Sequence, residues 1–286
     1  MGRALVLTTA SKANTTGGTF ADTLTANSGD SLAVANFNDG QANLLEMWGN
    51  DSTSVMEGQM IYTRPQSTHD QSHGFRFQNA SLLAGSAAKV GAQEYLPGKV
   101  GFQLYKSDTA VVQVTSTAAD NCAVSYNILY DDLPGAAGVF ISPAQADQLQ
   151  NSIVGINVAA VTSATRGAYG ASRAFNTDDA RLHANTWYCI CGYTLQTPVM
   201  TVSLIGPDWG GQRIGCPAGS IQIESSSWFL DQSVKWGKAM IPVFNSNNKG
   251  NILVQSCDTS TSTSAQFDFQ LVELNAPSNW SPVGGQ

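Results

Sequence analysis

Two histidines four residues apart are the first candidates for chemistry in this sequence. His69 and His73 lie in the stretch TRPQSTHDQSHGF, and Asp70 follows the first of them. Imidazoles at this spacing share one face of a helix and can ligate a single metal ion. Pro65 and the surrounding Ser, Gln and Gly residues favour a loop instead. We therefore expect a solvated loop here and assign no metal ligand.

The adjacent carboxylates of Asp131 and Asp132 could perform acid–base chemistry or bind calcium. They end the strand-like run LYDDLPG, and the corresponding place later in the chain holds Glu273 alone. Charge and a following proline both oppose continuation of a strand. We expect this acidic pair to terminate a strand.

The run GDSL at residues 29–32 resembles the signature of GDSL hydrolases, in which the serine is the nucleophile. Such a serine normally follows a buried apolar strand, whereas the preceding TLTANS is polar and turn-like. The Asp-x-x-His pair of those enzymes is missing, because Ala180 stands three residues before His183. We expect Ser31 to lie in a turn before the strand LAVANF, and we assign no catalytic residue.

Five cysteines provide the remaining soft metal ligands. Cys189 and Cys191 are two apart in TWYCICGY, so in a strand both thiols face one side. A zinc site needs more ligands at suitable spacing. We expect buried free thiols in a reducing cytoplasm. The other three are Cys122, Cys216 and Cys257.

Six tryptophans could stack on sugars, as in a lectin-like site. Trp187, Trp228 and Trp236 fall in or beside elements that we expect in the core, so packing is the favoured role. Trp209, in PDWGGQ, is flanked by turn residues and is expected at a loop tip.

The composition excludes some classes of protein. Only 12% of the 286 residues are charged, whereas about a quarter is usual in a soluble protein. Ser, Thr, Asn, Gln and Gly supply most of the polarity, which suits a chain in contact with copies of itself. The net charge is -7, and Arg3 and Lys12 are the only basic residues near the N-terminus. We expect no direct nucleic-acid binding, which needs clustered Lys and Arg.

An internal repeat organises the chain. The segments 98–134 and 237–277 both open with Gly-Lys, pass through two apolar runs, and end in an alternating strand that stops at proline. A constant offset of 143 residues joins the matching positions, and the chain length of 286 is twice that offset. One structural unit used twice is the simplest explanation. The matched pairs are Val124 with Phe267, Tyr126 with Phe269, Ile128 with Leu271, and Pro134 with Pro277.

The repeat extends to earlier segments. The strand-like run 54–62 matches 198–206, and the alternating run 74–78 is matched to 220–224. Helices are then expected at 81–96 and 225–236. Each half therefore has several short strands, one helix and three more strands. We expect the matched residues of the last strand in each half to be buried, namely Tyr126, Ile128, Phe269 and Leu271.

A different segment joins the two halves. Ser142, Pro143 and Gln145 form a helix start, with Ser as the cap, Pro at the first position and Gln completing a capping box. The division is 1–141 for the first unit, 142–153 for a linker helix and 154–286 for the second unit. Residues 154–181 are small and irregular, and we expect a long loop excursion with some strand.

This plan resembles the double jelly-roll major capsid proteins of tailless icosahedral, membrane-containing phages and related viruses. The resemblance covers roughly 30–134 and 186–277. In that family each jelly roll carries a helix between its sixth and seventh strands, and the helices expected at 81–96 and 225–236 would take those places. The segment 154–181 departs from the family plan.

The resemblance implies an all-β fold of two tandem jelly-roll β-sandwiches. It also implies a homotrimer of pseudo-sixfold outline that tiles an icosahedral shell, assembled in the host cytoplasm and located in the virion. The partners would be copies of the chain, a penton or spike protein and an internal membrane, with no enzyme activity, cofactor or metal. Two alternatives stay open: a virion spike or carbohydrate-binding β-sandwich, and a GDSL-like hydrolase using Ser31.

Overall fold

The structure is a computed structural model of the 286-residue chain. It describes residues 2–12, 22–26, 42–51, 56–63, 73–78, 102–105, 108–116, 121–133, 139–162, 168–175, 181–195, 199–217, 226–257, 264–277 and 280. The candidate residues Ser31, His69 and Asp70 lie outside this part of the chain, as does the helix expected at 81–96.

The described residues of the first half form strands. They are β1 (Gly2–Lys12), β2 (Asp22–Thr23), β3 (Thr25–Ala26), β4 (Ala42–Asp51), β5 (Met56–Thr63), β6 (His73–Gln78), β7 (Phe102–Leu104), β8 (Thr109–Ser116) and β9 (Cys122–Leu133).

In its described residues the second half adds two α-helices and two 3-10 helices to its strands. In chain order they are β10 (Phe140–Ile141), α1 (Pro143–Leu149), β11 (Gln150–Thr162), β12 (Arg173–Ala174), β13 (Trp187–Leu195), β14 (Thr201–Ile205), η1 (Pro207–Trp209), β15 (Arg213–Pro217), α3 (Trp228–Trp236), β16 (Ile241–Asn245), η2 (Ser246–Asn251), β17 (Leu253–Cys257) and β18 (Ser264–Leu274). None of the helices in the described residues is long and apolar enough to cross a membrane.

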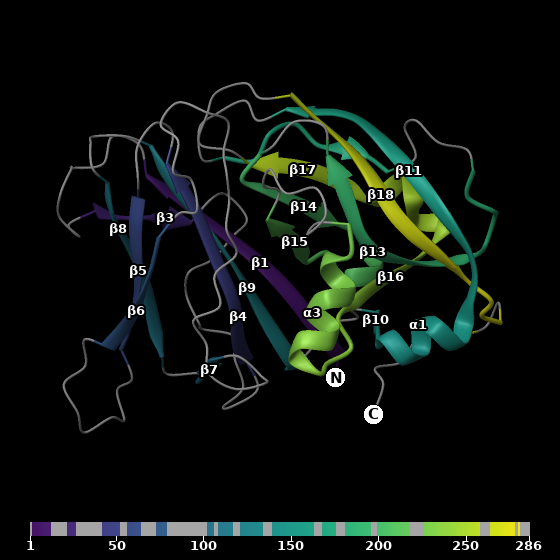
Figure 1. Cartoon of the computed structure of the whole chain (residues 1–286), viewed down its shortest axis with the longest axis horizontal. Helices are drawn as coiled ribbons and strands as arrows, with labels where there is room; N and C mark the ends of the chain where they lie inside the picture. The colour runs from purple at the N-terminus through teal and green to yellow at the C-terminus, as the bar shows by residue number, and fades with distance from the viewer. Residues whose placement is uncertain are drawn as a thin grey trace.

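Each half forms two antiparallel sheets, and the strand order agrees between the halves once the two-residue edge strands β3 and β10 are set aside. The five-stranded sheets run β3-β1-β9-β4-β7 and, read in the equivalent direction, β11-β18-β13-β16-β10. The four-stranded sheets run β2-β8-β5-β6 and β12-β17-β14-β15. Figure 1 shows the four sheets as successive layers, with the five-stranded sheet of the first half beside the four-stranded sheet of the second. The expectation of an all-β fold is confirmed.

Strand register shows that the two halves are equivalent residue by residue. Ile128 of β9 lies between Val6 of β1 and Leu44 of β4. In the second half Leu271 of β18 lies in the same way between Val154 of β11 and Ile190 of β13. A β-bulge follows directly after Leu44 and again after Ile190. A bulge re-aims the side chains beyond it, so the repeat preserves local irregularities as well as strand order.

The matched aromatic and aliphatic residues form the cores of the two halves. Tyr126 and Ile128 are buried in the first, and Phe269 and Leu271 are fully buried in the second. Phe269 contacts Phe175, with ring centroids 4.9 Å apart. The burial expected from the 143-residue offset is confirmed.

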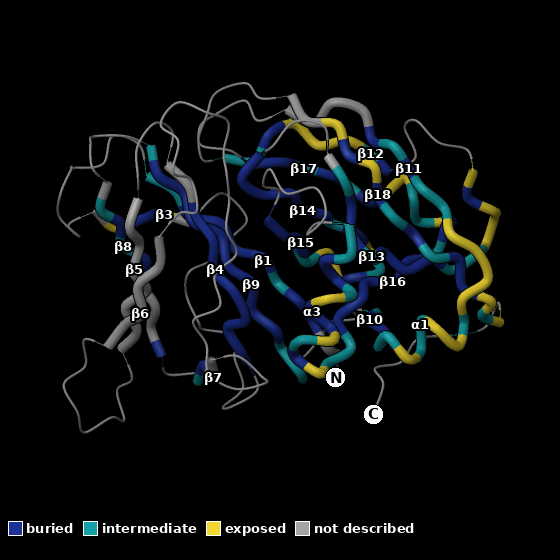
Figure 2. Tube along the Cα trace, viewed as in Figure 1, coloured by how far each residue is buried: buried dark blue, intermediate teal, exposed yellow. Residues whose placement is uncertain are grey.

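The sheet formed by β1, β9 and β4 is buried on both faces. Figure 2 shows continuous burial along these strands, and residues 122–129 of β9 are all buried. One face packs inside the first half, where Val124 and Tyr126 join Val112 and Val114 of β8. The opposite face packs against the second half. Purely apolar–polar alternation therefore fails in these strands because neither face meets water.

The helix start at Ser142 is confirmed, but the segments after it differ from the expectation. The Ser142 hydroxyl accepts from the Gln145 amide, and the Gln145 side chain accepts from the Ser142 amide. Helix α1 then ends at Leu149, so no linker helix reaches 153. Strand β11 occupies 150–162. The loop excursion expected at 154–181 therefore begins as a strand. Pairing with β18 along nearly its whole length makes this segment a strand.

The helix expected at 225–236 is confirmed as α3, between β15 and β16. Gly237 ends it in the left-handed conformation, with φ of 63°. One repeat assignment is wrong: β15 pairs with β14 as β6 pairs with β5, so the partner of 74–78 is β15 at 213–217. The segment 220–224, first matched to it, lies outside the described residues.

Candidate functional site

The contact between the two halves is the most elaborate polar site in the described residues. The outer face of the β1–β9–β4 sheet lies on β14 and β15 of the second half. The hydroxyls of Thr9, Ser125 and Thr201 form a buried chain, with oxygen–oxygen distances of 2.7 and 2.9 Å. The Trp48 indole N–H donates to the Thr201 hydroxyl at 2.8 Å, and the Tyr169 hydroxyl lies 2.6 Å from that of Thr9. We call these five residues the hydroxyl cluster.

The hydroxyl cluster is built by alternation along the strands. Thr9 and Ser125 are direct partners in the β1–β9 ladder, so their side chains leave the sheet on the same face. Thr201 begins β14 opposite them. Every hydroxyl in the group has a partner, which is the condition for burying polar groups at little cost. The hydroxyl cluster therefore fixes the position of one half relative to the other through hydrogen bonds between uncharged groups.

An ion pair lies beside the hydroxyl cluster. Lys235 of α3 bonds to Glu46, whose side chain is only 2% exposed. Gln232, one turn earlier on α3, donates to the same carboxylate oxygen at 3.3 Å. A second pair, Lys238 with Asp131 at 3.2 Å, is partly exposed on both sides. Helix α3 is therefore tied by charge to β4, and the residue just beyond its C-cap is tied to β9 of the first half.

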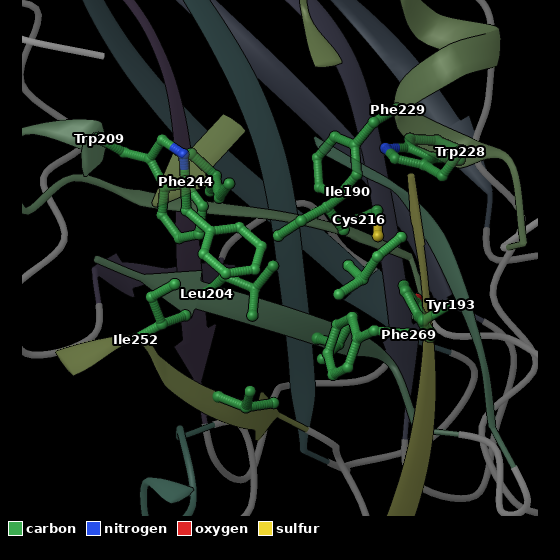
Figure 3. Close-up of a cluster of buried hydrophobic side chains, with 14 of the residues drawn as sticks. Ile190, Tyr193, Leu204, Trp209, Cys216, Trp228, Phe229, Phe244, Ile252 and Phe269 are labelled. Carbon is green, nitrogen blue, oxygen red and sulfur yellow. The ribbon is translucent and has the colours of Figure 1, made fainter. Parts of the chain in front are cut away.

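Apolar side chains complete the contact. Leu5, Leu45 and Leu129 of the first half belong to the main core cluster of the second. Trp48 meets Trp228 edge-to-face, with ring centroids 6.3 Å apart. Figure 3 shows Trp228 and Phe229 reaching from α3 into this core. The core of the second half therefore extends onto the outer face of β1, β4 and β9, while the interior of the first half forms a separate cluster.

A glycine allows a close approach between the halves. A Cβ atom built on Gly215 of β15 would lie 2.7 Å from Cδ2 of Leu7, which is closer than real contacts permit. The Asn127 amide also donates to the Gly215 carbonyl at 3.2 Å. Leu7 and Asn127 are partners in the β1–β9 ladder. Gly215 of β15 thus lies against both members of one cross-strand pair of the first half, Leu7 and Asn127.

The acidic pair expected to end a strand does so. Asp131 and Asp132 are followed by Leu133, the last residue of β9. Asp131 has the further role of binding Lys238, which the sequence did not reveal. His73 is the first residue of β6, so the second histidine of the expected loop begins a strand.

The tryptophans pack as expected, with one correction. Trp228 and Trp236 are buried, and Trp187 packs edge-to-face on Trp280 at 5.6 Å. Trp209 is not at a loop tip: it is buried, and its indole N–H donates to the Val243 carbonyl at 3.1 Å. Figure 3 places Trp209 beside Phe244. It cannot serve as an exposed sugar-stacking ring.

The two neighbouring cysteines lie on one side of β13, as expected. Both join the cluster between the outer face of that sheet and α1. The Cys189 thiol hydrogen-bonds to Cys191, which raises the pKa of Cys189 and lowers the pKa of Cys191. All five cysteines are free thiols. No group of three or more His, Cys, Asp or Glu residues that could hold a metal occurs in the described ranges.

A second polar cluster surrounds Glu273 near the end of β18. Its carboxylate accepts from the Asn151 amide at 2.8 Å and the Tyr188 hydroxyl at 3.1 Å, and Nδ1 of His183 lies 3.0 Å away. Burial tends to raise the pKa of Glu273, but these hydrogen bonds and the histidine lower it overall. Burial and the nearby carboxylate raise the pKa of Tyr188. His183 therefore contacts a carboxylate near the end of β18. Its sequence position does not give the Asp-x-x-His spacing of GDSL hydrolases.

Sequence reasoning missed the residues that join the halves. Glu46 was visible as a charge inside the apolar run NLLEMW, which is a signal for a buried partner. Hydroxyl residues in otherwise apolar strands, such as Thr9 and Ser125, gave a similar signal. The partners lie more than 70 residues away in sequence, so no local pattern identifies them.

No protein-family model and no curated protein sequence matches this chain. Among solved structures, the crystal structure of the major capsid protein P2 from bacteriophage PM2 aligns with 99% of this chain and 100% of that chain. The sequence identity is 9% and the TM-score is 0.22. A likeness this distant decides neither the fold family nor the function.

Proposed function

We propose that this protein is a structural virion protein, the major capsid subunit of an icosahedral virus, with two jelly rolls in one chain. It self-assembles as a homotrimer of pseudo-hexameric outline, and the trimers tile the shell. The observation that carries the proposal is the duplicated strand order. Setting aside the two-residue strands β3 and β10, the strands of each half order first-eighth-third-sixth in one sheet and second-seventh-fourth-fifth in the other. A jelly roll is a pair of Greek keys folded into two such sheets.

The position of α3 supports the same reading. It follows β15 and precedes β16, which are the fifth and sixth strands in the count used above and the sixth and seventh when β10 is included. The resemblance drawn from the sequence expects a helix at this place. The apolar contact between the halves and the Glu46–Lys235 ion pair hold them as one body. A shell subunit needs that rigidity, because bending within the chain would change the angles between capsomers.

We propose no catalytic role for the chain. His183, the histidine considered for a hydrolase, contacts Glu273 and belongs to the polar cluster near the end of β18. The test is ester hydrolysis by the wild type and by Ser31→Ala. Hydrolysis that disappears with this substitution would assign an enzyme.

The assembly is tested on the full-length protein. Native mass spectrometry and mass photometry are expected to give trimers, and cryo-electron microscopy is expected to give closed shells whose capsomers have six similar lobes. A stable monomer that binds glycans and never assembles would replace this proposal with a carbohydrate-binding module. Location in the virion follows if the chain is the most abundant protein of purified particles.

A further inference from the structure

The thiols of Cys189 and Cys191 lie on the face of β13 that points away from the main core. Ile190, the residue between them, projects into that core (Figure 3). Cys189 is flanked on both sides, because it pairs with Val243 of β16 and with Val272 of β18. Both cysteines belong to the apolar cluster that α1 covers, and their thiols are hydrogen-bonded to each other. Two sulfur atoms therefore meet on one apolar surface.

The two thiols differ in their access to solvent. Cys189 is 0% exposed, whereas Cys191 is only partly buried. Cys191 also lies at a β-bulge, since the pairing of β13 with β18 shifts register between Ile190 and Gly192. A bulge leaves its extra residue outside the regular ladder and re-aims the side chain there. A reagent dissolved in water can therefore reach the Cys191 sulfur first.

The hydrogen bond between the thiols also makes them unequal as nucleophiles. The Cys189 S–H donates to the Cys191 sulfur, which lowers the pKa of Cys191 although burial opposes that change. The same hydrogen bond, together with burial, raises the pKa of Cys189. The thiolate is the reactive form of cysteine. Cys191 is therefore the attacking group, and Cys189 is a protonated thiol in contact with it.

This combination is that of a peroxide-sensitive cysteine with a second cysteine that resolves it. Cysteines that sense oxidants have a low pKa, are accessible, and often lie beside a resolving thiol. The other three cysteines, Cys122, Cys216 and Cys257, are each at most 1% exposed. A zinc site fits less well, because zinc takes four ligands and no third His, Cys, Asp or Glu residue joins the two thiols in the described ranges.

We propose that Cys191 and Cys189 form an oxidation site that reacts with hydroperoxides and closes to a disulfide. The Cys191 thiolate attacks one oxygen of the O–O bond, that bond breaks, and the other oxygen leaves with a proton as water or an alcohol. Cys191 is then a sulfenic acid. The Cys189 sulfur attacks the Cys191 sulfur, the S–O bond breaks, and the departing hydroxide leaves as water with the proton of Cys189.

The reaction is stoichiometric and balanced. Two thiols and one hydroperoxide give one disulfide, one water and one alcohol, or a second water when the oxidant is hydrogen peroxide. The two sulfur atoms together lose two electrons, which reduce the O–O bond. This site goes beyond the proposed shell role and does not depend on it.

The spacing of the two cysteines predicts that the disulfide is easily reduced. Residues two apart in a strand are about 6.6 Å apart, near the upper end of the roughly 4.4–6.8 Å that separates the Cα atoms of a disulfide. The strand must therefore contract, which is easier at the bulge because Cys191 is outside the regular ladder. Strained disulfides are the labile ones, so we expect a thiol reductant to restore both cysteines.

Peroxide treatment of the full-length protein tests the site. Trypsin releases residues 182–213 as one peptide that holds Cys189 and Cys191 and no other cysteine. After hydrogen peroxide, mass spectrometry is expected to show this peptide two hydrogen atoms lighter, and dithiothreitol is expected to reverse the change. Both thiols of the pair are expected to disappear at least about 10-fold faster than those of Cys122, Cys216 and Cys257, since each unit of pKa changes the thiolate fraction about 10-fold.

Alanine variants separate the two roles without adding a polar group to the apolar cluster. Cys189→Ala is expected to leave a sulfenic acid on Cys191 that dimedone traps, whereas Cys191→Ala is expected to leave Cys189 reduced. Cys216→Ala is the matched control, because it removes a buried thiol elsewhere and is expected to oxidise as the wild type does. Circular dichroism checks the fold of each variant.

The wild-type measurement decides the proposal even where a variant does not fold. Retention of both thiols in the peptide 182–213 while other cysteines oxidise would overturn it. A sulfenic acid on Cys191 that persists in the wild type, with no disulfide, would overturn it as well, because Cys189 would then not be the resolving thiol.

Discussion

The Trp48 indole N–H donates to the Thr201 hydroxyl across the boundary between the two halves, and both side chains are fully buried. The same hydroxyl lies 2.9 Å from that of Ser125. Thr201 is therefore the point at which β4, β9 and β14 are joined by side-chain hydrogen bonds. Its removal affects two strands of the first half at once.

Thr201→Val keeps the shape of the side chain and leaves the buried Trp48 N–H without its acceptor. We expect the free energy of unfolding to fall by about 1–3 kcal/mol, the cost of an unsatisfied buried donor. Thr186→Val is the matched control, because Thr186 bonds to the Ala184 carbonyl at an exposed site. Urea unfolding followed by tryptophan fluorescence measures both. Equal effects of the two variants would contradict the role given to the hydroxyl cluster.

The two lysines of the α3 region give a contrast between buried and exposed ion pairs. Lys235→Met leaves Glu46 charged and buried, so we expect a loss of about 3 kcal/mol. Lys238→Met removes the pair with Asp131, which is partly exposed on both sides, and is expected to cost less than about 1 kcal/mol.

Adding Glu46→Gln to Lys235→Met is expected to restore part of the lost stability, because the uncompensated charge is then gone. Chemical denaturation of the single and double variants gives the coupling energy directly. Strictly additive losses would show that the two side chains act independently.

Phe269 is fully buried among Phe175, Tyr193 and Phe267, with ring centroids 4.9 to 6.1 Å apart. Phe269→Ala is expected to lower the free energy of unfolding by about 3–5 kcal/mol, since it leaves a cavity in a packed core. Ile153→Ala, on an exposed position of the neighbouring strand, is expected to change it by less than about 0.5 kcal/mol in the monomer. Calorimetry on dilute protein measures both, and a small loss for Phe269→Ala would reject the core assignment.

Glu273 makes stability depend on pH in the acid range. Its pKa in the folded chain lies below its ordinary value of 4.5, so the ionised form is favoured by folding. Its contribution is full above about pH 4.5 and is lost as the pH falls through the folded-state pKa. Glu273→Gln is expected to flatten the stability profile below pH 4.5, whereas Asp147→Asn on the exposed face of α1 serves as the control. A profile unchanged by Glu273→Gln would show that other carboxylates cause the acid sensitivity.

The repeat was predictable because two patterns can be read from the sequence. One is the alternation of apolar and polar residues along each strand, and the other is the constant spacing between matching positions. Tyr126 and Phe269 fall at equivalent places, since β9 lies between β1 and β4 and β18 lies between β11 and β13. Helix α1 was equally clear, because its capping box depends on residues three apart. The reliable signals were the alternation along strands, its recurrence at a constant spacing, and the capping box.

Features that depend on tertiary contacts could not be predicted. Strand β11 contains Gly155, Asn157 and two alanines, which have low strand propensity, among five Ile and Val residues that favour a strand, and pairing with β18 decides between these mixed signals. Trp209 is flanked by Pro, Asp and Gly, yet its ring folds back to bond with Val243. Lys235 and Glu46 are 189 residues apart, so only the fold brings them together.

The five-stranded sheet of the first half is covered on both faces, so we expect the two halves to unfold together in one cooperative transition. Separation of the second half would expose Leu5, Leu7 and Trp48 to water. Unfolding of one half alone therefore also costs free energy in the other half. The backbone amides of residues 122–129 in β9 should then exchange with deuterium only when the whole chain opens. What looks like two modules in sequence would behave as one cooperative unit, released or retained as a whole during proteolysis and heat treatment.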